Sequence, residues 1–172
     1  RNTYGGTYRM SMNVLKRQGM EFEWIDSRDS KNIKKHIRPN TKLVHVETPT
    51  NPLLELCDLQ ETSKICKEAG VLLSVDNTFM SPYGQRPLEY GVDIVMQSST
   101  KSLSGHSDIL GGVLTTNNDD LGDRIRFMLK ATGGVPSPFD NWILLRSVKT
   151  LSLRYQKSSE NALKLAQWIS TD

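Results

Sequence analysis

Three short apolar runs, at residues 42–46, 71–75 and 92–96, are the feature that most constrains the fold of this 172-residue chain. Runs with so few polar positions are typical of strands buried on both faces, as in parallel sheets. A helical pattern separates the first two runs, and Asp58 can cap its start while Gly70 can end it. Because strand, helix, strand is the order of a parallel crossover, the sequence predicts an α/β protein with a mostly parallel sheet covered on both faces.

Caps and periodicity predict the remaining elements. We expect helices at about 10–17, 31–37 and 119–130, and short strands at 22–25 and 112–116. Ser137 and Pro138 are suited to the start of one long helix, whose apolar stripe continues as far as Ile169. The glycine pair at 5–6 indicates a turn or a close approach of the backbone.

Charge and cysteine content argue against several classes of protein. The chain has 22 Lys and Arg against 19 Asp and Glu, a net charge of +3, and the basic residues are scattered. We therefore expect no nucleic-acid or membrane partner, and no apolar run is long enough to span a bilayer. The two cysteines, Cys57 and Cys66, form no C-x-x-C motif, so neither a disulfide framework nor a zinc site is expected, and a reducing cytoplasm fits.

Polar residues follow each of the three predicted strands. Asn51 lies beyond the first strand, Asp76 closes the second, and Lys101 follows the third. If the strands are parallel, all three residues reach the same edge of the sheet. Ligands of open α/β sheets bind beyond the carboxyl ends of the strands, so we expect a binding site there.

The segment that carries Lys101 combines an amine with hydroxyls. Ser98 and Thr100 can hydrogen-bond a phosphate, and a lysine shielded from water can form an imine with a carbonyl. Those two abilities point to pyridoxal phosphate, which has both an aldehyde and a phosphate. One alternative is an ordinary solvated loop lysine. The other is an S-x-x-K acyl enzyme, but residues 107–109 and 149–151 miss its S-D-N and K-T-G partner motifs at the third position.

Asp76 and Asn51 each have a structural and a functional interpretation. Asp76 can cap the turn that follows it through Asn77 or Thr78, or its carboxylate can keep a pyridinium nitrogen protonated. With Lys101 at the same edge we favour the second interpretation. Asn51 can hold the ring oxygen of the cofactor or a substrate carboxylate, or it can be a turn residue before Pro52.

Other candidate residues are less constrained by the sequence. Tyr4 can stack on a planar ring, and Arg9 can bind a carboxylate, although packing and solvation are the ordinary roles of such side chains. The three histidines are scattered, at positions 36, 45 and 106, and none is paired with another metal ligand. We therefore predict no metal site.

Four segments resemble the cysteine/methionine-metabolism family of pyridoxal-phosphate enzymes, in the family's order. They are residues 4–9 (YGGTYR), 47–52 (ETPTNP), 75–83 (VDNTFMSPY) and 98–108 (SSTKSLSGHSD). The family includes cystathionine γ-lyase, γ-synthase and β-lyase and methionine γ-lyase, and the resemblance runs essentially from end to end. It implies the aspartate-aminotransferase type of fold (fold type I) and a homotetramer built as a dimer of dimers.

The resemblance also implies roles for individual residues. Lys101 matches the imine lysine and Asp76 the partner of the ring nitrogen. Ser98 and Thr100 match the phosphate-binding hydroxyls. Tyr4 matches the residue that stacks on the ring, which is counted with the catalytic residues, Asn51 matches a contact to cofactor or substrate, and Arg9 an arginine near the substrate.

Several parts of the family pattern fall outside this chain. The phosphate-gripping glycine loop, and the Tyr and Arg from the neighbouring subunit, would precede residue 1, and the arginine for the substrate α-carboxylate would follow residue 172. We therefore expect a piece of a longer protein, with residues 1–153 in a pyridoxal-phosphate-binding large domain and 154–172 starting a C-terminal small domain. Ser102 departs from the family, in which many members have an aromatic residue after the lysine.

The resemblance implies β- or γ-elimination, or γ-replacement, on sulfur amino acids or their O-acyl homoserine precursors. Lys101 would take the Cα proton as general base and, for γ-chemistry, would also carry a proton to or from Cβ. The chemistry of a cystathionine γ-lyase or γ-synthase is the first expectation, and that of a cystathionine β-lyase or methionine γ-lyase is the alternative within the family. More distant alternatives are an aminotransferase and an inactive chain of the same fold.

Overall fold

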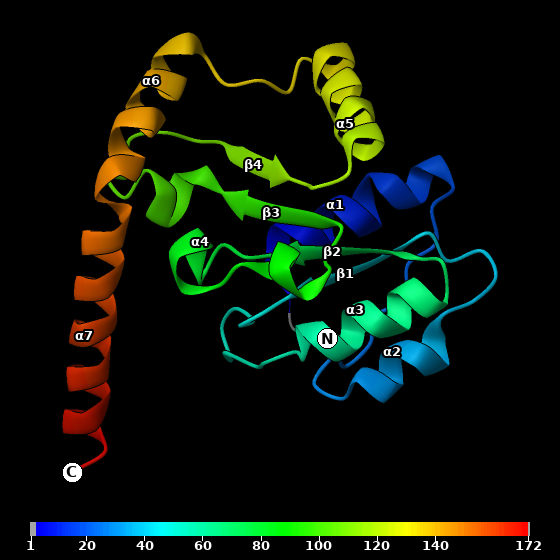
Figure 1. Ribbon diagram of the computed structural model, residues 1–172, viewed down its shortest axis with the longest axis horizontal. Helices are drawn as coiled ribbons and strands as arrows, with labels where there is room; N and C mark the ends of the chain where they lie inside the picture. The colour runs from blue at the N-terminus through cyan, green and yellow to red at the C-terminus, as the bar shows by residue number, and fades with distance from the viewer. Residues whose placement is uncertain (1–2, 172) are drawn as a thin grey trace.

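The computed structural model describes residues 3–171, and at its centre lies a four-stranded sheet in the order β1-β2-β3-β4 (Figure 1). The parallel strands are β1 (Leu43–Glu47), β2 (Leu72–Asp76) and β3 (Ile94–Ser98). β4 (Gly112–Thr115) pairs antiparallel with β3. The predicted mostly parallel α/β sheet is confirmed, and each parallel strand begins one or two residues later than the sequence indicated.

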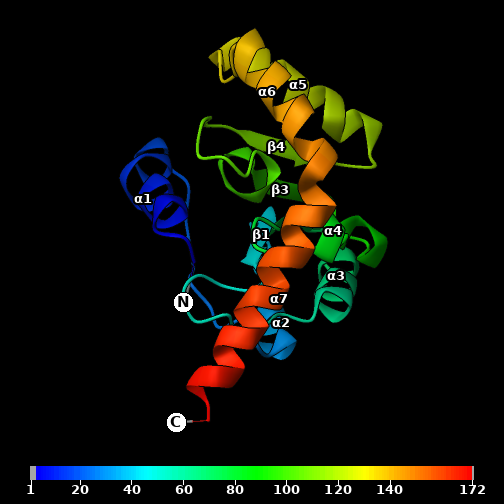
Figure 2. The same cartoon turned by 90° about the vertical axis from the view of Figure 1, so that its left-hand side faces the viewer.

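One face of the sheet is apolar and is covered by α2 (Ser30–His36) and α3 (Leu59–Glu68), as Figure 2 shows. Leu73 and Val75 are 0% exposed and Val95 is 3% exposed. They pack in one core cluster with Ile33 of α2 and Ile65 of α3. Burying an aliphatic side chain of this size contributes about 1.5–3 kcal/mol, so this face contributes strongly to the stability of the fold.

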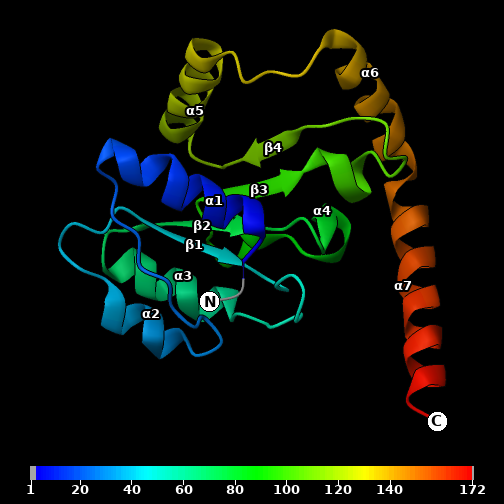
Figure 3. The ribbon, with the colours of Figure 1, turned by 180° about the vertical axis from the view of Figure 1, so that it is seen from behind.

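The opposite face of the sheet is polar at its carboxyl end. Side chains alternate along a strand, so Ser74 and Asp76 point away from α3, and Glu47 does the same because it pairs in register with Asp76. All three are buried. α1 (Gly5–Asn13) lies on this side and crosses the face in Figure 3. The two faces therefore differ in chemistry, although the apolar runs predicted burial of both.

Capping residues set the ends of the two helices on the apolar face. The Asp29 carboxylate accepts from the backbone N–H of Lys31 at 2.9 Å, and the Asp58 carboxylate accepts from that of Glu61 at 2.9 Å. Gly70, at φ +66°, follows α3 in the left-handed region that favours glycine. The predicted start and end of the helix between the first two strands are confirmed.

The predicted strand at 22–25 is wrong, since residues 20–26 have no regular secondary structure. Phe22 is 38% exposed, and the Trp24 ring packs at 5.2 Å from the ring of Tyr8 instead of facing a neighbouring strand. β1 pairs only with β2 among the described residues, so this segment adds no strand beside it. Local β-propensity was therefore not enough to predict this segment, whose tryptophan packs against α1.

The first helix begins earlier than predicted. α1 starts at Gly5, and a separate 3-10 turn, Leu15–Gln18, follows it. Gly6 permits a close approach, because a Cβ there would lie 2.5 Å from the Tyr4 ring. The close approach predicted for the glycine pair is therefore present, inside a helix and not in a turn.

The C-terminal third forms helices outside the sheet. α5 (Asp119–Thr132), α6 (Pro138–Ser147) and α7 (Leu151–Ile169) follow β4. The single long helix predicted from Ser137 is wrong, because a 3-10 turn, Val148–Thr150, divides it into α6 and α7. The Thr150 hydroxyl donates to the Ser147 carbonyl at 3.1 Å, the kind of local bond that competes with regular helix. Two short elements, α4 (Ser81–Gly84) and a 3-10 turn (Pro87–Tyr90), connect β2 to β3.

Both cysteines are free and buried. Burial raises the pKa of the Cys66 thiol to about 11 and that of Cys57 above its usual value. We therefore expect both thiols to resist alkylation by iodoacetamide at neutral pH in the native protein and to react fully in 6 M guanidinium, because the thiolate is the nucleophile. Peptide mass mapping measures this, and rapid labelling of Cys66 in the native protein would contradict it.

None of the helices within residues 3–171 has the length and apolar character needed to cross a membrane. Nor do these residues include three His, Cys, Asp or Glu side chains grouped closely enough to hold a metal ion.

Candidate active site

The carboxyl ends of β1, β2 and β3 meet at one edge of the sheet because the three strands are parallel. Register places Glu47 beside Asp76, and Asp76 beside Met96. The loops that carry Asn51 and Lys101 leave from this edge. The structure therefore gives Asn51, Asp76 and Lys101 the common edge that the strand pattern predicted.

Asp76 closes β2 with a buried side chain, 6% exposed. Its Oδ1 accepts from the backbone N–H of Thr78 at 3.0 Å, and the Thr78 hydroxyl accepts from the backbone N–H of Ser98 at 2.9 Å. The turn-capping interpretation of Asp76 is thus present, and it links β2 to the end of β3. Oδ2 has no hydrogen-bond partner among residues 3–171, so one carboxylate oxygen is available to a ligand.

Lys101 lies in a single π-helical turn, Ser99–Leu103, directly after β3. Its backbone, at φ −91° and ψ −125°, departs from helical geometry inside this turn. The Thr100 hydroxyl accepts from the backbone N–H of Gly111 at 3.0 Å, and the Ser99 N–H donates to the Gly111 carbonyl at 3.0 Å. The turn is thereby tied to the strand that follows, while Lys101 itself is exposed.

The hydroxyls of Ser98 and Thr100 are not equivalent. Ser98 is half-buried, and its side chain makes no hydrogen bond to another of the residues that the structure describes. The Thr100 hydroxyl accepts from the Gly111 N–H and donates to the Gly111 carbonyl, but its proton can rotate to a new acceptor. Two donors at a strand end beside an exposed amine suit an anionic group.

Glu47 is a site residue that sequence reasoning missed. It is 8% exposed, and its carboxylate accepts from the backbone N–H of Tyr4 at 2.6 Å, the N–H of Asn51 at 3.0 Å and the Thr3 hydroxyl at 3.2 Å. One side chain therefore holds the backbones of both Tyr4 and Asn51. The available signal was an acid at the end of an apolar strand, which the sequence analysis used only for Asp76.

Tyr4 lies at the start of α1, and Arg9 lies in the middle of the same helix. Tyr4 immediately precedes the helix, and it is 48% exposed. Arg9 is exposed, and its guanidinium folds back along the helix, with Nη1 3.2 Å from the position of a Cβ on Gly5. Among residues 3–171 Arg9 makes no ion pair, so the structure does not join it to the other predicted site residues.

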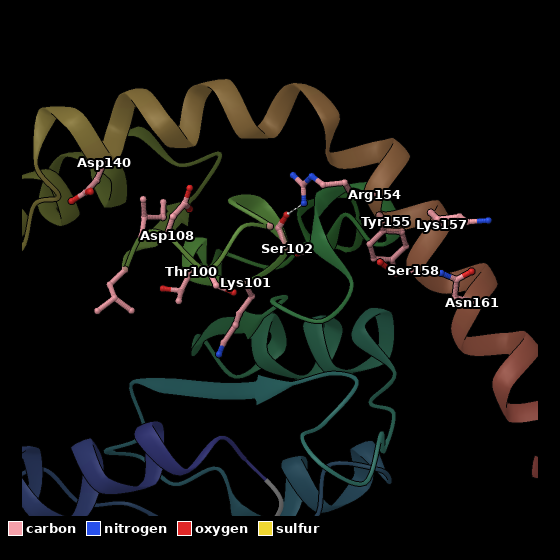
Figure 4. Close-up of a pocket in the computed structure, with 14 residues that line it drawn as sticks. Thr100, Lys101, Ser102, Asp108, Asp140, Arg154, Tyr155, Lys157, Ser158 and Asn161 are labelled. Carbon is pink, nitrogen blue, oxygen red and sulfur yellow. Dashed lines mark hydrogen bonds between the residues drawn. The ribbon is translucent and has the colours of Figure 1, made fainter.

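This donor set fits pyridoxal phosphate. It offers an amine for the aldehyde, hydroxyls for the phosphate, a carboxylate oxygen for the ring nitrogen and an exposed aromatic ring for stacking. Figure 4 shows the side chain of Lys101 pointing away from Arg154 and Tyr155, into the space on the other side of its turn.

The whole chain, residues 1–172, matches the family model described as Cys/Met metabolism PLP-dependent enzyme. The chain belongs to this family. The family is one of pyridoxal-phosphate-dependent enzymes of cysteine and methionine metabolism, which confirms the cofactor class and the enzyme class that the motifs predicted.

Named relatives agree with the family at the level of the fold and reaction class. The chain is 49% identical to a cystathionine gamma-lyase of Bacillus subtilis (98% of this chain, 44% of that protein) and 46% identical to a probable cystathionine gamma-synthase of Herpetosiphon aurantiacus (98% and 53%). A cystathionine beta-lyase of Coxiella burnetii is 42% identical (98% and 44%). The crystal structure of cystathionine gamma-lyase from Lactobacillus plantarum complexed with L-serine superposes with a TM-score of 0.97 at 42% identity (98% and 44%).

The chain thus spans about half the length of these members of the Cys/Met metabolism family. The likeness confirms the predicted fold, while lyases and synthases match at similar identity. Family membership therefore establishes the cofactor class without choosing among the specific reactions.

Replacing Glu47 by glutamine is expected to loosen the start of α1 and the loop at Asn51. The amide has one acceptor oxygen, so the N–H of either Tyr4 or Asn51 loses its partner, at a cost of about 1–3 kcal/mol in the free energy of unfolding. Urea denaturation measures this. Glu68→Gln, at an exposed position of α3, is the control, and equal stabilities of the wild type and Glu47→Gln would contradict the role.

The same variant should alter the pH dependence of stability. Burial raises the pKa of Glu47 above its usual range, against the opposing effect of the N–H donors. A carboxyl whose pKa is higher in the folded state stabilises the fold at low pH, and this contribution is lost as the pH rises through the folded pKa. The difference in urea midpoint between wild type and Glu47→Gln should therefore narrow as the pH rises above the ordinary range of a glutamate carboxyl.

Proposed function

We propose that this chain forms the cofactor-binding part of an enzyme that carries out β- or γ-elimination, or γ-replacement, on sulfur amino acids or O-acyl homoserine. The observation that carries the proposal is the meeting of Lys101 and the free Oδ2 side of Asp76 at one sheet edge, in a member of a pyridoxal-phosphate-dependent family. γ-Lyase and γ-synthase chemistry come first because those relatives are the more similar. β-Lyase chemistry is the alternative, supported by the 42% identity to a cystathionine beta-lyase.

Each predicted site residue has a place in this proposal. Lys101 would hold the cofactor covalently through Nζ, and Asp76 would accept a hydrogen bond from the ring nitrogen through Oδ2. Ser98 and Thr100 donate to the phosphate. Tyr4 stacks on the ring and Asn51 contacts the ring or the substrate. Arg9 is assigned to the substrate side by the family motif alone.

The bound cofactor supplies a cationic ring that stabilises negative charge at the substrate Cα. Lys101 would take the substrate Cα proton on Nζ as general base. For γ-chemistry the same Nζ would also carry a proton to or from Cβ. Asp76, whose Oδ1 is held by the Thr78 N–H, would place its other carboxylate oxygen toward the ring nitrogen.

We also propose the domain and assembly states implied by the family. Residues 1–153 would form the large domain and residues 154–172 would begin the small domain. The proposed boundary falls inside α7, and residues 1, 2 and 172 lie outside the described part of the chain. A homotetramer assembled as a dimer of dimers, in the cytoplasm, completes the proposal.

The decisive test is the visible spectrum of the full-length protein before and after borohydride. A yellow protein that bleaches, with the reduced cofactor on Lys101 by peptide mass mapping, is the expected result. Labelling on another lysine, or no uptake of added pyridoxal phosphate, would overturn the assignment. Formation of a 2-oxo acid without an amino-group acceptor then separates elimination from transamination.

A further inference from the structure

The turn that carries Lys101 is held from outside the sheet by one arginine of α7. The Arg154 guanidinium donates from Nη1 to the Ser102 carbonyl at 2.6 Å and from Nη2 to the Leu103 carbonyl at 3.2 Å. Nη2 also donates to the Ser147 carbonyl at 2.9 Å, and Nε to the Thr150 hydroxyl at 3.1 Å. One side chain therefore bridges the lysine turn and the junction of α6 with α7, as Figure 4 shows for Ser102.

Gly105 makes room for this bridge. A Cβ at Gly105 would lie 1.9 Å from Arg154 Nη1 and 2.5 Å from its Cζ, and the residue has φ +70°. Both the close approach and the left-handed backbone therefore favour glycine at the end of the lysine turn. The contact to position 102 uses the backbone carbonyl, so the serine found there does not affect it.

The next two residues of α7 reach the other loop that leaves the same edge. The Tyr155 ring packs at 5.7 Å from the Tyr83 ring, and its hydroxyl contacts Met80 Sδ at 3.5 Å. Gln156 Nε2 donates to the Tyr83 hydroxyl at 2.5 Å. This loop follows Asp76, so the first turn of α7 touches the exit segments of both β2 and β3.

We propose that Arg154 is a positioning residue, which fixes the Lys101 turn by tying its carbonyls to the start of α7. The inference rests on the proposed function, because it concerns the lysine of that site. Arg154 acts through the backbone of residues 102 and 103 and does not approach the amino group, which points away from it (Figure 4). The consequence is that the position of the first turn of α7 and the conformation of the Lys101 turn depend on each other.

Charge-assisted bonds to carbonyls are stronger than neutral ones, and in Arg154→Ala the carbonyls of Ser102, Leu103 and Ser147 each lose the bond from the guanidinium. We expect amide hydrogen exchange of residues 99–105 to become about tenfold faster or more in that variant, since local opening controls exchange. Exchange in β2 should be unchanged. The measurement uses the full-length protein without cofactor, read by mass spectrometry.

Lys157→Ala is the matched control. Lys157 lies one turn further along α7, and its ion pair with Glu160, at 3.7 Å, is exposed. Its removal should leave exchange of residues 99–105 as in the wild type. If Arg154→Ala cannot be produced as folded protein, Arg154→Lys provides the same test. A single ammonium cannot reach all the carbonyls, so amide exchange of residues 99–105 should be faster than in the wild type but slower than without any donor.

A second readout connects the turn to the cofactor. Arg154→Ala should weaken pyridoxal-phosphate binding, measured by the absorbance of the Lys101 adduct during titration, while Lys157→Ala should not. Wild-type exchange rates at 99–105 in both Arg154 variants would overturn the positioning role. Failure of the unmodified protein to take up cofactor at Lys101 would instead reject the proposed function, and the exchange comparison would still stand because it needs no cofactor.

Discussion

Replacing Lys101 by alanine is expected to lower turnover of the full-length protein by at least about 10³-fold. A general base alone contributes roughly 10²- to 10⁴-fold, and the variant also loses the nucleophile that attaches the cofactor. The exposed Lys101 side chain makes no hydrogen bond within the described residues, so the fold should be unaffected. Formation of 2-oxo acid from cystathionine measures turnover, and the spectrum after borohydride measures attachment.

Lys130→Ala is the control for this experiment. Lys130 is an exposed lysine in the last turn of α5 and lies outside the proposed site. It should keep wild-type turnover and wild-type labelling of Lys101. Near-normal activity of Lys101→Ala would show that another group removes the proton, and the mechanism proposed here would be wrong.

Replacing Asp76 by asparagine is the second large effect that we expect. The amide oxygen can still accept from the Thr78 N–H, so the turn after β2 is preserved, while the negative charge that we propose as the partner of the ring nitrogen is lost. We expect turnover to fall by about 10²-fold or more, as is typical when one preorganised electrostatic group is removed. Steady-state kinetics measures the loss, and circular dichroism checks the fold.

Asp58→Asn provides a matched substitution. Asp58 caps α3 through one bond to the Glu61 N–H, and asparagine caps a helix about as well as aspartate. Turnover should be unchanged in this variant. If Asp76→Asn behaved like Asp58→Asn, the carboxylate of Asp76 would have only its turn-capping role.

The shared sheet edge of Asp76 and Lys101 could be predicted because its signals are local. Lys101 and Asp76 each follow an apolar run within a few residues, and parallel pairing brings such ends to one edge. The capping of α3 by Asp58 is equally local. The position of such residues is determined by their near neighbours in the sequence, so a short sequence window was enough to predict where they lie.

The features that sequence analysis missed depend on partners distant in the chain. Glu47 acquires its role from Tyr4, 43 residues away, and Arg154 from Ser102, 52 residues away. The segment at 22–25 forms no strand, and its tryptophan packs on Tyr8. No periodicity within a short window carries these contacts, which exist only once the sheet has brought the segments together.

The unequal faces of the sheet separate two kinds of mutational damage. Truncating Leu73, Val75 or Val95 removes buried apolar volume and should lower the cellular abundance of the protein. The turnover of each folded molecule should be unchanged. Changing Asp76 removes charge from the other face, so abundance should hold while output per molecule falls. A variant library scored for both protein abundance and turnover per molecule should therefore show an alternating pattern along β2. Substitutions on the face toward α2 and α3 should lower abundance, and substitutions on the face that carries Asp76 should lower turnover.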